Sequence, residues 1–455
     1  MISPARVAAY EILSAVEAGR ADLSDALAAT RTTLRDDRDK ALAAEIAIGV
    51  QRQRAALDHL IAHFARRPLH RLDREVLEIL RLSLYQLLHL TRVPAAAVVD
   101  DAVDLTGRAG KRSASGLVNA VLRAISRHRH ALPLPPRPED PNDRQRALEY
   151  LSVTLSHPAW LVSRWFDRYG FDATEDWLRF NNAPAPLTLR ANPLRNTPRE
   201  LIERLGKDEV VVHSARFAPD ALIVAAGHPL RGEGLDAGWF VVQDEASQLV
   251  TLLAGAEPGA LVLDACASPG GKTTALAAGM QGRGLLVACD IRDRRMDLLR
   301  RTVAASGATN VRLAQADLLR PLPFVRAFDC VFVDAPCSGL GTLRRDPDIK
   351  WRRQEDDLRS LAAAQLAMLR NAAAAVAPGG RLIYATCSSE REENESVVDA
   401  FLGGAADFSP VDLATRTAVP PSVIDERGHL RTYPHVHGLE AFFGAVFARR
   451  EHAAI

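Results

Sequence analysis

The second half of the chain is organised by five short apolar runs that alternate with helix-like segments. The runs occupy residues 260–266, 284–290, 310–317, 328–336 and 381–387. Runs of this length between helices are typical of a parallel sheet covered on both faces, so we predict an α/β domain with a mostly parallel sheet over 241–450. Ligands of such sheets bind at the carboxyl ends of the strands. Each run has a carboxylate or a thiol at or near its end, which indicates a functional site there. These end residues are Asp264, Asp290, Asp317, Asp334 and Cys387.

The first part of the chain has a different pattern. Residues 1–130 are predicted to form an all-α domain, because apolar residues recur at helical spacing over 74–90, 93–107 and 113–128. This region carries 20 Lys and Arg against 15 Asp and Glu, although the whole chain has a formal net charge of +1. The local surplus is a mild indication of a polyanionic partner, and an ordinary solvated basic surface explains it equally well.

A proline-rich stretch separates this region from the rest. Five prolines lie between residues 133 and 141, where neither a helix interior nor a central strand tolerates them, so 131–142 is predicted to be a linker. Residues 143–240 combine a helix after Pro158 with strand-like runs around a second short helix, which predicts a small α+β segment. The chain is therefore predicted to be multidomain.

The cysteine content bears on the compartment. The five cysteines are odd in number and form no C-x-x-C pair, which disfavours both a disulfide framework and a zinc site. No apolar run approaches the roughly 18 to 20 residues of a membrane span, and the N-terminus has no signal-peptide pattern. We expect a cytoplasmic protein with reduced thiols, no metal and no membrane contact. Nothing in the sequence indicates an obligate oligomer, so a monomer is expected.

A glycine-containing turn, CASPGGK at 266–272, follows the first apolar run. A P-loop would need its first glycine at position 266, which is Cys266, so the ATPase interpretation fails on spacing. In a Rossmann-like sheet, Gly270 and Gly271 would instead let the backbone approach a ligand, and Asp290, 19 residues after Gly271, could hold ribose hydroxyls. The turn lacks the G-x-G-x-x-G pattern that suits a dinucleotide. S-adenosylmethionine, which has a ribose but no pyrophosphate, fits better.

Two cysteines follow neighbouring predicted strands. Cys337 comes after the fourth run and Cys387 after the fifth, so adjacent parallel strands would hold both thiols over one site. Cys289 and Cys330 lie within apolar runs, where a packing role is favoured. Ser389 and Glu392 match a capping box and predict a helix from about residue 390, whose N-terminus would favour the Cys387 thiolate, although the acidic residues nearby oppose this effect.

A thiol, a carboxylate and a methyl donor together suit one reaction. Carbon 5 of a pyrimidine becomes nucleophilic only after a thiolate adds to carbon 6, and Asp334 is placed to contact N3 and the exocyclic amine of a cytosine. A base then removes the C5 proton and the thiol leaves. A paired base cannot expose these atoms, so the target would be unpaired or flipped out.

Three motifs carry a resemblance to a known family. DACASPGGKTT at 264–274, DAPCSGLGTLRRDPDIKW at 334–351 and YATCSSEREENE at 384–395 resemble motifs of the Sun/Fmu family of RNA cytosine-C5 methyltransferases, which acts on small-subunit 16S ribosomal RNA. The resemblance spans nearly the whole chain, and residues 1–130 look like the NusB-like RNA-binding domain of these enzymes. It implies S-adenosylmethionine as cofactor, 5-methylcytosine in RNA as product and a covalent Cys–C6 adduct as intermediate.

The resemblance also implies roles for individual residues. Cys387 would be the nucleophile, Cys337 would assist product release, and Asp334 would contact cytosine N3. Arg345 and Lys350 would lie near RNA. The cofactor site would be lined by Cys266, Ala267, Ser268, Pro269, Gly270, Gly271, Lys272, Asp290, Asp317 and Asp334. Two departures from the family pattern are Ser268, where alanine is usual, and Glu440-Ala441, where Asp-Gly is usual.

Two alternatives from other classes stay open on the sequence. The N-terminal region alone resembles NusB, which would suit a non-enzymatic RNA-binding or antitermination factor, and the catalytic thiols oppose that interpretation. The P-loop ATPase is the other. For an RNA-binding protein of this kind, affinity should fall as salt rises.

Overall fold

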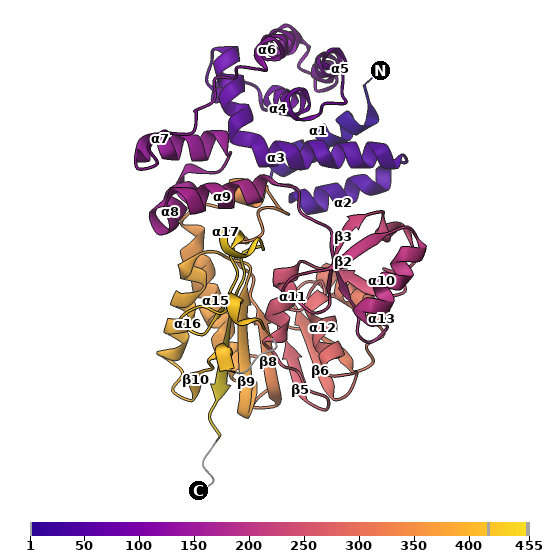
Figure 1. Ribbon diagram of the computed structural model, residues 1–455, viewed down its shortest axis with the longest axis vertical. Helices are drawn as coiled ribbons and strands as arrows, with labels where there is room; N and C mark the ends of the chain where they lie inside the picture. Colours follow the sequence, from indigo (N-terminus) through magenta and orange to yellow (C-terminus); the bar gives the residue numbers. More distant parts are fainter. Residues whose placement is uncertain (1, 416–418, 452–455) are drawn as a thin grey trace. The chain divides into compact units, whose positions relative to one another are not determined.

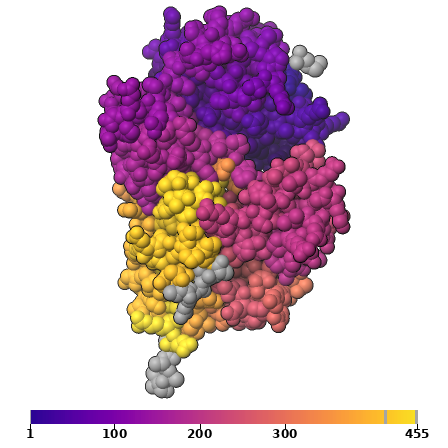
Figure 2. Space-filling model, in the orientation of Figure 1, coloured from indigo at the N-terminus to yellow at the C-terminus, as the bar shows by residue number. Residues whose placement is uncertain are grey.

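The computed structural model describes residues 2–415 and 419–451 and divides into two compact units. Unit 1 comprises residues 1–184 and 343–355, and unit 2 comprises residues 185–342 and 356–455. Each unit can be located by its colours in the ribbon and space-filling views (Figure 1, Figure 2). Within the described ranges, no helix combines the length and the apolar character that crossing a membrane requires.

Unit 1 is helical throughout. Its helices are α1 (Pro4–Glu17), α2 (Leu23–Thr33), α3 (Asp37–Ala65), α4 (Arg74–His89), α5 (Ala95–Arg108), α6 (Ser115–His128), α7 (Arg144–Glu149), α8 (Ala159–Tyr169), α9 (Phe171–Asn182) and α14 (Ile349–Arg352). The predicted helices within 1–130 are present as α4, α5 and α6. Their apolar faces enclose one core together with α1 and α3, in which Ile46, Leu80 and Leu122 are fully buried.

The proline-rich stretch lacks helix and strand, as predicted, but it is bonded to its surroundings. The ring Nε2 of His59 lies 2.9 Å from the carbonyl oxygen of Pro133, and the Thr154 hydroxyl donates to the Pro135 carbonyl at 2.6 Å. The stretch is therefore part of the packed unit.

Helices α7 to α9 also belong to unit 1. One bond that joins them to the N-terminal helices runs from the Ala55 amide to the Ser156 hydroxyl, at 2.8 Å. The boundary between the units lies at residue 184, inside the segment predicted as one piece over 143–240. The sequence did not reveal this division because it depends on which neighbour the helices α7 to α9 pack against.

Unit 2 contains two sheets. The strands are β1 (Thr188–Ala191), β2 (Val211–Ser214), β3 (Ala221–Ala226), β4 (Phe240–Val242), β5 (Leu261–Asp264), β6 (Leu285–Asp290), β7 (Val311–Gln315), β8 (Phe328–Asp334), β9 (Val376–Thr386), β10 (Phe408–Pro410), β11 (Leu430–Arg431) and β12 (Phe443–Arg449). The helices are α10 (Pro198–Lys207), α11 (Glu245–Leu252), α12 (Gly271–Gly279), α13 (Asp293–Ser306), α15 (Asp357–Ala373), α16 (Glu395–Leu402) and α17 (Pro434–His437).

The large sheet has the order β10-β12-β9-β8-β5-β6-β7, and β11 pairs with β12. Strands β5 to β9 are parallel and correspond to the five predicted runs, whereas β12 runs antiparallel to β9 and β10. The antiparallel edge was not predicted. Strands β10 and β11 have three and two residues and give no pattern, whereas β12 is an apolar run of seven residues that the prediction overlooked. The strand order reverses between β5 and β8, which is where open α/β sheets bind their ligands.

Both faces of the large sheet are covered, as its apolar strands require. Along β5, Val262 packs into one apolar cluster and Leu263 into the other, because successive side chains point to opposite faces. The first cluster includes residues of α11, α12 and α13, and the second includes residues of α15 and α16 (Figure 1). The buried Cys330 and Cys289 lie in the first and second cluster respectively, in agreement with their predicted packing roles.

The small sheet has the antiparallel order β2-β3-β1-β4 and carries helix α10. Thr197 and Glu200 form a reciprocal capping box at the start of α10. The sequence predicted β1, β3 and α10, but not the short strands β2 and β4.

The loop 343–355 belongs to unit 1 and buries a lysine. Lys350 is 1% exposed, and its ammonium nitrogen lies 3.0 Å from the Arg52 carbonyl oxygen and 3.3 Å from Asn182 Oδ1. Burial lowers the pKa of Lys350 well below its ordinary range. The predicted RNA contact by Lys350 conflicts with this position, because the side chain is enclosed by protein. Arg345 is half-buried in the same loop.

We expect Lys350→Ala to lower the free energy of unfolding by about 2 kcal/mol, because it leaves a cavity and two unpaired acceptors. The thermal midpoint should fall accordingly. The slope of RNA affinity against salt should stay that of the wild type. The control, Lys207→Ala at an exposed position of α10, should leave the midpoint unchanged. An unchanged midpoint with a reduced salt slope for Lys350→Ala would show instead that Lys350 contacts a phosphate.

Candidate active site

The predicted site residues of the glycine turn and the strand ends meet at one edge of the large sheet. Asp264, Asp290 and Asp334 are the last residues of β5, β6 and β8, Asp317 follows β7, and Cys387 follows β9. Because these strands are parallel neighbours, residues spread over more than 120 positions of the sequence share one edge. The predicted RNA contacts, Arg345 and Lys350, belong to unit 1.

The glycine turn connects β5 to α12 at the point where the strand order reverses. Gly270 has φ +105°, which non-glycine residues rarely adopt, and a Cβ there would lie 3.0 Å from side-chain atoms of Leu299 and Thr302. The Ala267 amide donates to the Cys289 carbonyl at 2.8 Å, and the Ser268 amide donates to Asp290 at 3.1 Å. These bonds fix the turn against β6.

An arginine that the sequence analysis did not single out supports this turn. Arg190 of β1 is 3% exposed and donates to the Gly271 carbonyl, and also to the Thr274 hydroxyl and to Gln243 Oε1, both at 2.6 Å. Burial lowers the pKa of Arg190 to about 10. The small sheet thereby holds the first turn of α12. A strand arginine in an arginine-rich chain gives no signal of this role.

The polar groups of this edge suit a cofactor that is positively charged. The carboxylates present belong to Asp290, Asp317 and Asp334, and the lysine of the turn, Lys272, lies 2.7 Å from Asp334 Oδ2. Carboxylates accept bonds from ribose hydroxyls and attract a sulfonium and an ammonium group, but they repel phosphates. The site therefore fits S-adenosylmethionine. It disfavours the ATPase alternative, whose lysine would have to face a phosphate.

Two thiols stand together beside this cofactor region. The Sγ atoms of Cys337 and Cys387 are 3.1 Å apart, and both residues are half-buried. The hydrogen bond to Cys387 and burial raise the pKa of Cys337 well above its ordinary range. Either sulfur can be the donor in this contact, and the raised pKa disfavours the thiolate of Cys337.

A lysine brings positive charge to the thiol pair. Burial opposes the charge of Lys272, but the carboxylate of Asp334 raises its pKa, and Cys387 adds to this effect. Lys272 also lies 5.7 Å from the ring centroid of Phe442. Cationic side chains are the usual surroundings of reactive cysteines.

The capping box predicted after Cys387 is wrong. The Ser389 hydroxyl bonds to Glu390 at 2.8 Å, residues Arg391–Glu393 form a short 3-10 turn, and α16 begins only at Glu395. Helix α16 starts eight residues after Cys387, so its dipole does not act on the thiol in the predicted way. The physical reason is that Glu393 is fully buried and bonds to the cysteine loops.

The backbone hydrogen bonds around the thiols are present although Ala441 departs from the family pattern. The Ala441 amide donates to the Gly341 carbonyl at 2.9 Å, and the Gly341 amide donates to the Cys387 carbonyl at 2.9 Å. A Cβ at Gly341 would lie 1.9 Å from the Ala441 carbonyl oxygen, so the loop approaches too closely for any other residue. Ser268 donates its amide to Asp290, as an alanine would, and adds a bond from its hydroxyl to the Arg295 carbonyl at 3.1 Å.

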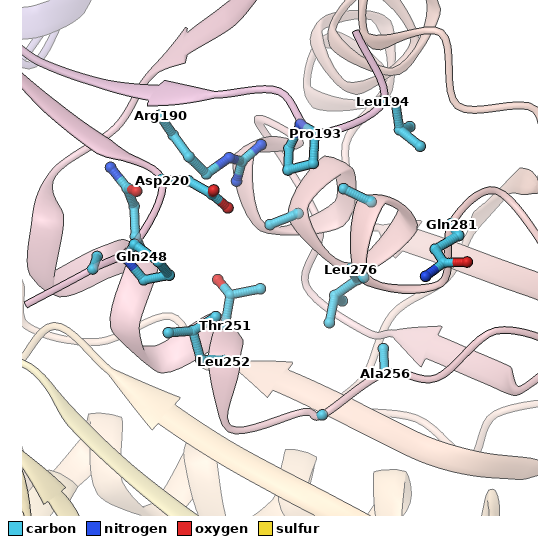
Figure 3. Close-up of a pocket in the computed structure, with 16 residues that line it drawn as sticks. Arg190, Pro193, Leu194, Asp220, Gln248, Thr251, Leu252, Ala256, Leu276 and Gln281 are labelled. Atoms are coloured by element: carbon cyan, nitrogen blue, oxygen red, sulfur yellow. The ribbon is translucent and has the colours of Figure 1, made fainter. Parts of the chain in front are cut away.

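A pocket of about 730 Å³ lies elsewhere in unit 2 (Figure 3). It is lined by residues of α11 and α12 and by Arg190 and Asp220, and it includes none of the predicted cofactor or catalytic residues. Arg190 lines this pocket and also bonds to the first turn of α12, which follows the glycine turn of the site.

Asp264 is a buried acid at the end of β5 that does not belong to the predicted cofactor set. It is 0% exposed and accepts a bond from the Thr273 hydroxyl at 2.7 Å. Burial raises the pKa of Asp264 to about 7, although the bond from Thr273 opposes this rise. An unfolded aspartate ionises near pH ~4, so the protonated folded form is most stable below that value. Stability is then lost as pH rises toward about 7.

We therefore expect Asp264→Asn to weaken the decline in thermal midpoint between about pH 5 and about pH 7.5, because the amide cannot ionise. Melting curves of cofactor-free protein measure this decline. Asp236→Asn, at an exposed position, should follow the wild type. Equal declines for wild type and Asp264→Asn would contradict the assigned protonation.

Several known proteins and family models are similar to this chain. A family model described as 16S rRNA methyltransferase RsmB/F matches residues 250–448, a NusB family model matches 3–127, and a ferredoxin-like domain of RsmF/B-like methyltransferases matches 157–231. A probable ribosomal RNA small subunit methyltransferase B of Bacillus subtilis is 34% identical and covers 90% of both chains. Ribosomal RNA small subunit methyltransferase B of Pseudomonas putida is 33% identical, covering 91% of this chain and 92% of the relative.

Solved structures show the same fold. The crystal structure of PH0851 has a TM-score of 0.80 and 26% identity, and the match covers 98% of this chain and 99% of that one. NSun6 from Pyrococcus horikoshii, solved with the S-adenosylmethionine analogue SFG, has a TM-score of 0.57 at 19% identity over 64% of this chain and 98% of that one. S-adenosylmethionine is the cofactor of the RsmB/F family. The chain belongs to the RsmB/F family of S-adenosylmethionine-dependent methyltransferases of small-subunit ribosomal RNA.

Proposed function

We propose that this enzyme forms 5-methylcytosine in 16S ribosomal RNA through a covalent bond between Cys387 and carbon 6 of the target cytosine. The observation that carries the proposal is the pair of thiols, 3.1 Å apart at the carboxyl edge of the sheet, beside the ion pair of Lys272 and Asp334. Methylation of a base nitrogen or of a hydroxyl uses a lone pair and needs no enzyme nucleophile. Methylation of a pyrimidine C5 does need one.

Asp334 favours cytosine over uracil. A carboxylate accepts a bond from the exocyclic amine of cytosine, whereas uracil presents a carbonyl oxygen at the same place, and two acceptors repel. Lys272, bonded to Asp334 at 2.7 Å, keeps the carboxylate oriented.

The reaction follows from these groups. The Cys387 thiolate forms the S–C6 bond, and the electrons of the C5–C6 double bond make C5 nucleophilic. The cofactor would supply an electrophilic methyl group on its sulfonium; as the C5–methyl bond forms, the sulfonium–methyl bond would break and the neutral thioether S-adenosylhomocysteine would leave. A base then removes the C5 proton, the double bond re-forms, and the S–C6 bond breaks to return the thiolate. Cys337, in contact with the Cys387 sulfur, assists this release.

The substrate base must leave any duplex, because a stacked and paired cytosine hides C5 and C6. RNA affinity would come in part from the basic surplus of residues 1–130. We expect the enzyme to act as a monomer in the cytoplasm.

Cysteine variants test the two roles. Cys387→Ala should abolish the transfer of tritium from labelled S-adenosylmethionine to RNA, because no thiolate activates C5, and it should form no adduct. Cys337→Ala should accumulate a protein–RNA adduct that survives denaturing electrophoresis, because release is impaired. Cys330→Ala, in the apolar core, is the control and should form no lasting adduct.

The reverse pattern would exchange the roles of Cys337 and Cys387, and active Cys387→Ala enzyme would refute the covalent mechanism. Bisulfite sequencing of ribosomal RNA from a strain that lacks the gene identifies the target, which should be one 5-methylcytosine lost from the small subunit.

A further inference from the structure

We propose that Glu393 is the positioning residue of the thiol pair, because its buried carboxylate holds the loops after β8 and β9 together and keeps the proton of the pair on Cys337. The inference deepens the proposed function and rests on it. Glu393 lies in the short 3-10 turn Arg391–Glu393 and is 0% exposed.

The carboxylate bonds to the residue that follows each cysteine. Its Oε1 accepts from the Ser338 amide at 2.8 Å, next to Cys337, and its Oε2 accepts from the Ser388 hydroxyl at 2.5 Å, next to Cys387. One rigid group therefore spans both loops. A shift of either loop would change the distance between the two sulfur atoms.

Two further side chains, those of Gln365 and Tyr384, bond to Glu393. Gln365 of α15 donates its amide to Glu393 Oε1 at 2.9 Å and to the Pro336 carbonyl at 3.0 Å. The Tyr384 hydroxyl donates to the Glu393 carbonyl at 2.6 Å. Amide nitrogens only donate, so Oε1 accepts two bonds, one from Ser338 and one from Gln365.

The charge of Glu393 acts on one thiol. The side chains that face Cys337 are those of Cys387, Glu393 and Tyr384, and a backbone bond from Gly339 opposes the rise of its pKa. The bond to Cys387 and burial raise the pKa of Cys337, and the charge of Glu393 raises it further. Burial also raises the pKa of Tyr384, so that ring stays neutral. Lys272 brings the opposing positive charge and interacts with Cys387. The charge of Glu393 thus favours a thiol at Cys337, and that of the half-buried Lys272 acts on Cys387.

Glu393→Gln separates charge from geometry. The glutamine oxygen can accept from Ser338 and Gln365, and its amide can donate to the Ser388 hydroxyl, which accepts as readily as it donates. The variant therefore retains the bonds and loses only the charge. Glu392→Gln, one residue earlier in the same turn, makes the same chemical change and is the matched control.

The experiment is alkylation of the full-length protein by iodoacetamide at about pH 8.5, followed by mass spectrometry of tryptic peptides. Cys337 lies in peptide 327–344 and Cys387 in peptide 382–391. In Glu393→Gln, the rate at Cys337 should rise about tenfold, because the negative charge that opposes the Cys337 thiolate is removed. The alkaline limb of the pH profile of methyl transfer should move to lower pH. Glu392→Gln should behave as the wild type.

An unchanged Cys337 rate in folded Glu393→Gln, or an equal rise in Glu392→Gln, overturns the inference. If Glu393→Gln does not fold, Ser388→Ala serves instead. It removes the bond that ties the carboxylate to the loop of Cys387, so the inference predicts a faster reaction at Cys337, whose contact with Cys387 is loosened, and an unchanged rate overturns it. Alkylation does not depend on methyl transfer. A Cys337 effect without cytosine methylation by the wild type would therefore refute the proposed function alone.

Discussion

The arrangement of the active site depends on the adjacency of β8 and β9 in the parallel sheet. Cys337 and Cys387 are 50 residues apart in sequence, and they meet at 3.1 Å because each follows one of these two neighbouring strands. The reversal of strand order between β5 and β8 places the glycine turn beside them. One topological arrangement thereby brings the cofactor turn, the carboxylates and both thiols to the same edge.

Charged side chains bond to the elements of this arrangement and stabilise it. Asp334 pairs with Lys272 next to Cys387, and Glu393 spans the two cysteine loops from the other side. Arg190 performs a similar task for the cofactor turn, from a different sheet. Buried charges are costly unless they are paired and hydrogen-bonded, so their presence around the thiols indicates that geometry and protonation are maintained for the reaction.

The parallel strands, the glycine turn and the neighbouring thiols could be predicted from sequence, because apolar runs with polar ends report strand position directly. The roles of Glu393 and Lys350 could not. SEREENE has the composition of an exposed helix start, and Lys350 lies in a basic loop, yet both side chains are buried. Their environment is made by residues distant in sequence, such as Gln365 for Glu393 and Arg52 for Lys350. Local patterns carry no information about such contacts.

The central claim is that Cys387 is the sulfur that bonds to cytosine. The most direct measurement is mass spectrometry of the wild-type enzyme trapped on RNA that carries 5-fluorocytidine at the target, since fluorine at C5 prevents the release step. After nuclease and trypsin digestion, the account predicts a nucleotide on LIYATCSSER, residues 382–391, whose one cysteine is Cys387. A nucleotide on peptide 327–344, which contains Cys337, or no nucleotide on either peptide, would contradict it.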